Sequence, residues 1–145
     1  MGKRSRWLAL AVAVGALAGL AGCGSATDLP VFAEAQGPED LLPADGTPNV
    51  IEGLDASTTR LLWEDAGATF YAARMAGSDA AVTCLVIFRG EEGVSGCGGL
   101  PVTVGLVGRP DYRLEAADLP NGSDQWTRVA EYLYEAKKPT EKGTP

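Results

Sequence analysis

The segment AVTCLVIFRGEEGVSGCG, residues 81–98, decides what kind of fold this chain can adopt. Residues 81–89 form the clearest strand of the sequence, because β-branched, aromatic and other apolar residues follow one another there. An extended backbone directs Val82, Cys84, Val86 and Phe88 to one face and Thr83, Leu85 and Ile87 to the other. A strand that is apolar on both faces is typical of a sheet covered on both sides. We therefore expect this strand to be central.

The first 22 residues have the layout of an export signal. Lys3, Arg4 and Arg6 form a basic start, and residues 7–20 form an uncharged, apolar stretch. A helix of that length covers about 21 Å, which is short of the roughly 30 Å hydrocarbon core of a bilayer. A signal peptide is therefore favoured over a permanent transmembrane helix.

The end of this signal resembles the lipobox of bacterial lipoproteins, because Leu20-Ala21-Gly22-Cys23 sets leucine and two small residues ahead of a cysteine. As the resemblance implies, residues 1–22 are removed, and Cys23 receives a thioether-linked diacylglycerol and becomes the new N-terminus. The protein is then anchored by lipid to the extracytoplasmic face of the cell membrane. The alternative is an ordinary secretory signal that is cleaved near Ala21 or Ala26.

The cysteine count agrees with export. Once Cys23 is acylated, the chain keeps Cys84 and Cys97, an even pair in a setting where disulfides persist. A bond between them would close a loop of about fourteen residues, worth roughly 3 kcal/mol in the chain-entropy account. Two buried free thiols are the alternative.

A disulfide between these cysteines would also define a hairpin register. If Cys84 lies opposite Cys97, paired residue numbers add up to 181, so Arg89 pairs with Glu92 and Gly90-Glu91 is a two-residue loop. Glycine first in such a loop is typical of a type II′ turn, and opposite charges across two strands are favourable. The alternative is a longer loop over residues 90–93.

Charge and composition exclude several functions. Removing residues 1–22 takes away three basic and no acidic residues, so the formal net charge changes from −7 to −10. Such a charge argues against nucleic acid as a partner and against a basic contact with anionic lipid. The chain has no histidine, which excludes Ser-His-Asp and Cys-His catalysis and histidine-ligated zinc. We expect neither a metal nor another cofactor.

Four segments are expected along the chain: the signal peptide (1–22), a lipid-anchored tether rich in proline and acidic residues (23–48), a small globular domain (49–136) and a disordered tail (137–145). The tether shows no period of 2 or 3.6, and it cannot bury enough apolar area to offset its ordering entropy. Val31-Phe32 and Leu41-Leu42 are the exceptions that could dock on the domain.

The domain is expected to be mainly β, a small antiparallel sheet or meander with one disulfide, and an α+β arrangement is the alternative. Residues 60–64 and 68–75 indicate two strands around a turn that contains Gly67. A short helix over residues 57–66, capped near Asp55 or Ser57 and ending at Gly67, competes with the first of these strands.

The rest of the domain gives weaker patterns. Residues 101–107 and 112–116 indicate two more strands, with a turn at residues 108–111 between them. The spacing of Trp126, Val129 and Leu133 would suit a helix, but we favour a last strand at 131–135.

Several short motifs are similar to those of small lipoproteins of uncharacterised function from actinobacteria. The motifs are residues 57–62, Phe70-Tyr71-Ala72-Ala73-Arg74, Thr83-Cys84-Leu85-Val86, Ser95-Gly96-Cys97-Gly98 and the late Trp126. The resemblance covers most of residues 28–136. It implies no activity, and no functional residue is carried over through it.

Candidate chemistry is sparse. Glu64-Asp65 and Glu91-Glu92 are adjacent carboxylates, whereas a glycosidase needs two carboxylates that converge across a cleft, and neighbours on a strand point to opposite faces. The glycines of residues 96–99 precede no Lys-Ser or Lys-Thr pair, so no phosphate-binding loop is indicated. A bulge or a close backbone approach beside the disulfide explains them better.

Two functions from different classes fit the sequence. The first is a non-enzymatic surface module that binds a protein partner, a glycan or an envelope component; the second is a carboxylate-based hydrolase or a cation-binding protein. An exposed aromatic patch would favour the first, and a cleft with converging carboxylates of raised pKa would favour the second. We expect the first and name no catalytic residue.

Overall fold

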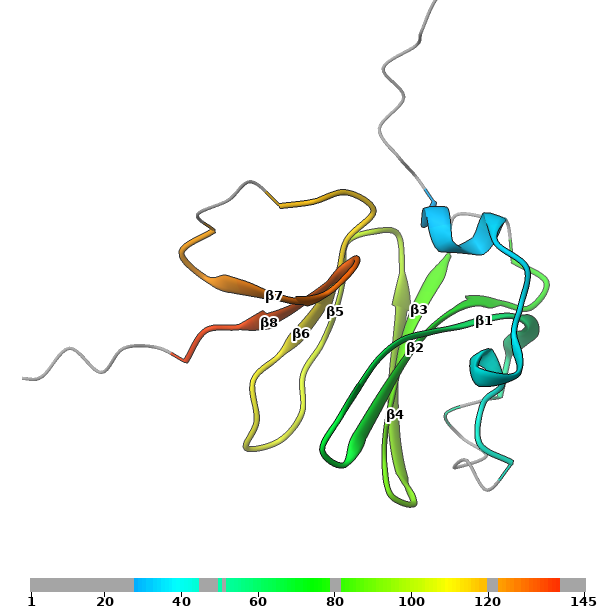
Figure 1. Ribbon diagram of the computed structural model, residues 1–145, viewed down its shortest axis with the longest axis horizontal. Helices are drawn as coiled ribbons and strands as arrows, with labels where there is room; N and C mark the ends of the chain where they lie inside the picture. Colours follow the sequence, from blue (N-terminus) through cyan, green and yellow to red (C-terminus); the bar gives the residue numbers. More distant parts are fainter. Residues whose placement is uncertain (1–27, 45–49, 51, 79–81, 120–122, 139–145) are drawn as a thin grey trace, which may run out of the picture.

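The computed structural model describes residues 28–44, 50, 52–78, 82–119 and 123–138, which form two antiparallel sheets that pack against each other (Figure 1). The first sheet has the order β1-β2-β3-β4, with β1 at Leu54–Asp65, β2 at Ala68–Met75, β3 at Thr83–Arg89 and β4 at Glu92–Gly98. The second has the order β5-β6-β8-β7, with β5 at Val102–Val104, β6 at Tyr112–Leu114, β7 at Trp126–Ala130 and β8 at Leu133–Ala136. The expected mainly β fold with one disulfide is confirmed, and its division into two sheets is new.

The main core lies between the two sheets. Its buried members from the first sheet are Ala68, Phe70, Ala72, Leu85 and Ile87, and those from the second are Val102, Val104, Tyr112, Leu114 and Leu133. Phe70 is fully buried, and its ring lies 5.0 Å from that of Trp63 and 4.7 Å from that of Tyr112, measured between centroids. Aromatic contacts at these distances join β1 and β2 to β6 across the core.

Strand β3 is central, as the sequence predicts. Leu85 and Ile87 point into the main core, and Cys84, Val86 and Phe88 belong to a second buried cluster on the other face of the first sheet. Tyr71, Ala73 and Val50 complete that cluster, and Leu42, Leu54 and Leu61 pack against it. The first sheet therefore buries apolar side chains on both faces.

The β3–β4 hairpin has the predicted register. Cys84 pairs with Cys97 and Arg89 with Glu92, without a bulge between them. Gly90, the first loop residue, has a φ of 56°. Glu91, the second, has a negative φ, because the positive-φ non-glycine residue of the described chain is Tyr132. A positive φ at the first loop position alone is the pattern of a type II′ turn. The two-residue loop is confirmed over the longer alternative.

Residues 57–65 are extended and residue 66 begins the turn that follows, so the competing helix over residues 57–66 is wrong. Strand β1 covers Leu54–Asp65 and pairs with β2 through a turn in which Gly67 has a φ of 99°. The pairing skips register between Asp55 and Arg60 and again between Leu61 and Trp63. The extended conformation is preferred because β1 pairs and packs with β2, a contact that the local helix signals of the sequence do not report.

The C-terminal part contains one strand more than predicted. The favoured last strand is present as β8, Leu133–Ala136, but Trp126 also lies on a strand, β7, so a helix there is wrong. The two strands form a hairpin whose turn includes Tyr132 at a φ of 63°. The strand expected over residues 101–107 is limited to Val102–Val104, because only these three residues pair with β6.

Residues 28–44 pack on the sheets, so the expectation of a free tether is wrong for this part of the chain. Two short 3₁₀ helices, η1 at Pro30–Ala33 and η2 at Pro38–Asp40, lie along the first sheet (Figure 1). Leu29 is only 2% exposed and belongs to the main core. Phe32 packs against that core, and the guanidinium of Arg74 lies over its ring, with 4.7 Å between the guanidinium carbon and the ring centroid. Asp28 forms an ion pair with the same arginine.

Hydrogen bonds attach this N-terminal segment to β1. The carboxylate of Asp40, which is buried, accepts the backbone N–H of Leu61 at 2.7 Å and that of Gly37 at 2.7 Å. Arg60 is also buried, and its Nη2 donates to the carbonyl oxygen of Glu34 at 2.6 Å. Such bonds need single polar residues at exact places in space, which explains why hydrophobic periodicity missed the segment.

Gly96 marks a close approach between β4 and β5. A β-carbon at this position would lie 2.8 Å from Cγ2 of Val104, whereas one at Gly98 would meet no heavy atom within 4 Å. The sequence suggested either a bulge or a close backbone approach for the glycines of residues 96–99, and at Gly96 the structure shows the close approach.

We expect Gly96→Ala to lower the free energy of unfolding by about 1–3 kcal/mol, because the added methyl group overfills the contact with Val104. Gly98→Ala is the matched control on the same strand. Thermal unfolding of the two variants measures the difference. Equal melting temperatures for both would contradict the packing described for Gly96.

Other sequence predictions concern residues outside the described ranges. They are the signal peptide (1–22), the lipidation site Cys23, the tether residues 24–27 and 45–48, and residues 139–145 of the tail. Among the helices that the described ranges contain, none has the length and hydropathy needed to cross a membrane.

Candidate binding groove at the open end of the sandwich

A groove opens between the two sheets beside the β3–β4 turn. It has a volume of about 450 Å³. The first sheet contributes Ile87, Arg89, Glu92, Gly93 and Val94, and the loop between β5 and β6 contributes Gly105, Leu106, Val107 and Arg109. The volume lies within the range of roughly 300–1,000 Å³ that is usual for small-molecule sites.

The alternation of β3 builds one wall of the groove. Leu85 and Ile87 face the space between the sheets, so Arg89 two residues later faces the same space at its open end. Glu92 lies opposite Arg89 in the ladder and shares this face. The strand thus changes from apolar to charged where the core meets solvent.

The β5–β6 loop builds the other wall. The backbone N–H of Arg109 donates to the carbonyl of Leu106 at 3.0 Å, and Gly108 has a φ of 72°, so the chain reverses tightly at this point. The turn leaves Val107 fully exposed at the tip, while Leu106 packs against the main core. Val107 and Arg109 consequently stand at the rim of the groove.

The two groove arginines differ from the other arginines of the described chain. Arg74, Arg113 and Arg128 form ion pairs with Asp28, Glu115 and Asp118, and Arg60 donates to backbone carbonyls. Neither Arg89 nor Arg109 belongs to these three ion pairs of the described residues. With Glu92 as the acidic residue of the lining, the groove carries a formal charge of +1 in a chain that is strongly acidic.

Tyr112 lies behind Arg89 in the main core. Burial raises the pKa of its phenol, the nearby Glu135 and Asp65 act in the same direction, and Arg89 opposes them. A hydrogen bond between the Arg89 side chain and the phenol also acts to lower this pKa, and the phenol is neutral near neutral pH. The Nε atom of Arg89 is buried and has no hydrogen-bond partner among the described residues.

The adjacent carboxylates named by the sequence do not build an acid–base pair. Glu64 and Asp65 are exposed at the end of β1, opposite Thr69 and Ala68, and Glu91 and Glu92 are exposed at the β3–β4 turn. Asp55 has a lowered pKa, because the side chain and backbone N–H of Ser57 donate hydrogen bonds to its carboxylate. Within the described ranges, no three acidic or cysteine side chains gather as metal ligands would.

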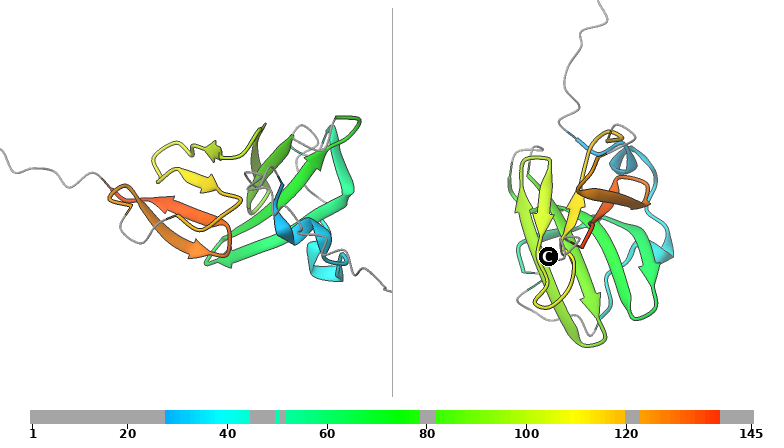
Figure 2. Two further views of the ribbon diagram at one scale, coloured as in Figure 1. Left: turned by 90° about the horizontal axis from the view of Figure 1, so that it is seen from above. Right: turned by 90° about the vertical axis from the view of Figure 1, so that its left-hand side faces the viewer.

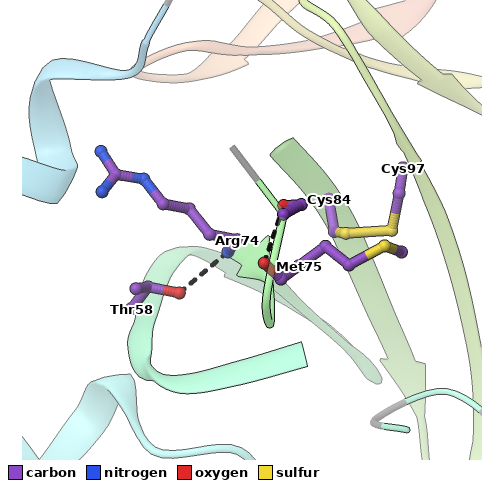
Figure 3. The surroundings of a disulfide bond; sticks show 6 residues. Thr58, Arg74, Met75, Cys84 and Cys97 are labelled. Atoms are coloured by element: carbon purple, nitrogen blue, oxygen red, sulfur yellow. Dashed lines mark hydrogen bonds between the residues drawn. A yellow bond between two sulfur atoms is a disulfide. The ribbon is translucent and has the colours of Figure 1, made fainter. Parts of the chain in front are cut away.

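The predicted disulfide between Cys84 and Cys97 is present (Figure 3). Cys84 is fully buried in the second cluster, but Cys97 is exposed on β4, so the bond is buried at one end only. The reason is that β4 forms the edge of the first sheet. Met75 and Thr58 lie in the surroundings of the bond, and Thr58 Oγ1 accepts the backbone N–H of Arg74 at 2.8 Å.

The surface carries few large apolar side chains. Those exposed in the described chain are Leu41, Met75 and Val107, all of them aliphatic or thioether side chains. An exposed aromatic patch, which would have favoured a binding module, is thus missing from the described residues. The sequence did not point to the groove; its only local signal is the apolar pair Leu106-Val107 between Gly105 and Gly108, followed by Arg109.

Comparison with known proteins adds no assignment. No protein-family model matches the chain, and neither a curated protein nor a solved structure matches it.

Proposed function

We propose that this protein is a lipid-anchored lipoprotein on the extracytoplasmic face of the cell membrane and acts as a non-enzymatic binding module. The groove between the β3–β4 hairpin and the β5–β6 loop is the observation that carries the binding role. It combines apolar walls with a few charged side chains, which is the usual make-up of a ligand site.

The disulfide and the layout of the N-terminus support the location. A cross-strand disulfide persists in an oxidising compartment, where an exported lipoprotein would reside. Four residues lie between Cys23 and Asp28, the first described residue, and the five steps along the chain span at most about 18 Å. An anchor at Cys23 would therefore hold the sheets close to the membrane rather than on a long spacer.

The arrangement of the sheets would direct the groove away from that membrane. The 3₁₀ helix η1, in blue just after the start of the described chain, lies at the top of Figure 1 and near the top of the right-hand view of Figure 2, and the β3–β4 turn lies at the bottom of both. The groove adjoins that turn, so it is at the end of the molecule remote from the proposed anchor. A binding site in that position would be open to partners in the envelope.

Lipidation is tested with the full chain and its Cys23→Ser variant. We expect the wild-type protein to fractionate with membranes, with an intact mass that lacks residues 1–22 and includes added acyl groups. The variant should lose the acyl mass and leave the membrane fraction. Ser25→Ala is the control, because it alters a nearby residue outside the lipobox and should change neither result. A Cys23→Ser protein that stays on the membrane would contradict the anchor.

A further inference from the structure

The charge distribution in the groove defines the ligand it can accept. Arg89 is the last residue of β3, and Arg109 lies in the β5–β6 loop. Both side chains line the same groove of about 450 Å³. Guanidinium groups donate several hydrogen bonds in a planar fork that suits carboxylate and phosphate oxygens. Two of them in one groove, outside the three ion pairs of the described chain, indicate a site for an anion.

The apolar part of the groove indicates that the anion has a hydrocarbon body. Ile87 is 1% exposed and lies at the floor, and Val94 and Leu106 flank it as partly buried side chains that pack against the main core. Val107 adds a fully exposed apolar side chain at the rim. A bare inorganic ion would leave the exposed parts of Val94, Leu106 and Val107 in contact with water, whereas an alkyl group would bury them.

Glu92 is the acidic residue of the groove lining, and it weakens an anion site without cancelling it. It is exposed and lies opposite Arg89 in the β3–β4 ladder, where solvent screens its charge. Arg109 lies on the other wall, in a different segment. Among the lining residues two cationic groups face one anionic group, and the carboxylate of Asp111 beside Gly105 reduces the resulting attraction for a monoanion.

We propose that the groove binds a small organic anion, a carboxylate or phosphate monoester with a short apolar body, whose oxygens contact Arg89 and Arg109 and whose hydrocarbon part contacts Ile87, Val94 and Leu106. This assignment deepens, and rests on, the binding role proposed above. Carboxylates and phosphate monoesters present the same oxygen chemistry to a guanidinium, and the experiment separates them.

The test follows backbone amide shifts of the full-length protein, in nonionic detergent, during titration with four probes. Hexanoate and hexyl phosphate should bind saturably and shift the amides of Gly93, Gly105 and Val107. Hexanamide, which has a similar body without charge, should bind at least tenfold more weakly. Hexylammonium should not bind there. A tighter complex with hexanoate would assign a carboxylate as the ligand, and a tighter complex with hexyl phosphate would assign a phosphate monoester.

Substitutions identify the groups that carry the binding. Arg109→Gln, at an exposed loop position, should weaken anion binding about tenfold, or about 1.4 kcal/mol, without disturbing the fold, because it removes a charged hydrogen-bond donor. Arg89→Gln should act in the same direction, and Glu92→Gln should tighten binding. Arg128→Gln is the matched control, because Arg128 pairs with Asp118 and is not part of the groove lining.

Three results would overturn the assignment: equal affinity for hexanoate and hexanamide, preference for hexylammonium, or no localised shift with either anion. Unchanged affinity in Arg109→Gln would overturn the role of that residue and with it the two-arginine site. These failures differ from failure of the proposed function. Loss of anion binding in a protein that still fractionates with membranes through Cys23 refutes the ligand class alone, whereas a protein that never reaches the membrane refutes the location.

Discussion

Replacing Leu29 with alanine should lower the free energy of unfolding by about 2–5 kcal/mol, the usual cost of truncating a buried leucine. Leu29 is 2% exposed and packs among residues of both sheets, although it precedes the first strand by more than twenty residues. For a domain of this size the melting temperature should fall by roughly 10 °C or more. Urea unfolding followed by tryptophan fluorescence measures the free energy directly.

The matched control for Leu29 lies in the same N-terminal segment. Leu41 is 58% exposed, so Leu41→Ala should change the free energy of unfolding by less than about 0.5 kcal/mol. A large difference between the two variants would show that residues 28–44 are part of the cooperative fold. A small and similar change in the free energy of unfolding for both variants would mean that this segment is a tether outside the cooperative fold.

Removing the disulfide should have an effect of similar size. Cys84→Ser/Cys97→Ser is expected to lose on the order of 2–5 kcal/mol and to melt roughly 10 °C or more below the parent. The bond closes a loop in the unfolded chain, and in the fold it ties the edge strand β4 to the central strand β3. Three of the seven residues of β4 are glycines, which favour the unfolded state through their entropy, so this edge depends on the link.

Serine at the buried position 84 would itself place a hydroxyl in an apolar cluster, so a second measurement isolates the link. Wild-type protein reduced with a phosphine lacks the bond but keeps both thiols, so its melting temperature should lie well below that of the oxidised protein and at or above that of the double variant. Non-reducing peptide mapping should recover one linked peptide with both cysteines. A melting temperature that is unchanged by reduction would contradict the stabilising role of the bond.

The β3–β4 hairpin was predictable in detail from local sequence. Its two-sided apolar strand, the glycine at the first loop position and the spacing of Cys84 and Cys97 all require the same register, and the observed pairs follow it from Thr83 to Glu92. Few other pairings satisfy these conditions together, because a slip of one residue would move every side chain to the opposite face. Lipidation at Cys23 is a prediction of the same local kind, and it awaits its experiment.

The N-terminal segment was not predictable by the same means. Residues 28–44 lack periodicity because they contribute one buried apolar side chain, Leu29, partly buried ones such as Phe32 and Leu42, and a few polar groups such as Asp40, whose partner Leu61 is 21 residues away. Such contacts gain their energy only when a distant strand presents the matching N–H group or cavity. Periodicity reports a face repeated along one element, so it cannot detect single anchoring residues.

The sequence itself thus determined three features: the strand pairing within residues 81–98, the mainly β class and the disulfide. It did so through side-chain alternation, turn chemistry and cysteine spacing. The tertiary structure alone decided that the strands divide into two sheets, that Leu29 closes the core between them and that Arg89 and Arg109 face one groove. The two arginines lie twenty residues apart on different elements. Their meeting depends on how β5 packs against the face of β4 at Gly96, an approach between surfaces that no local pattern encodes.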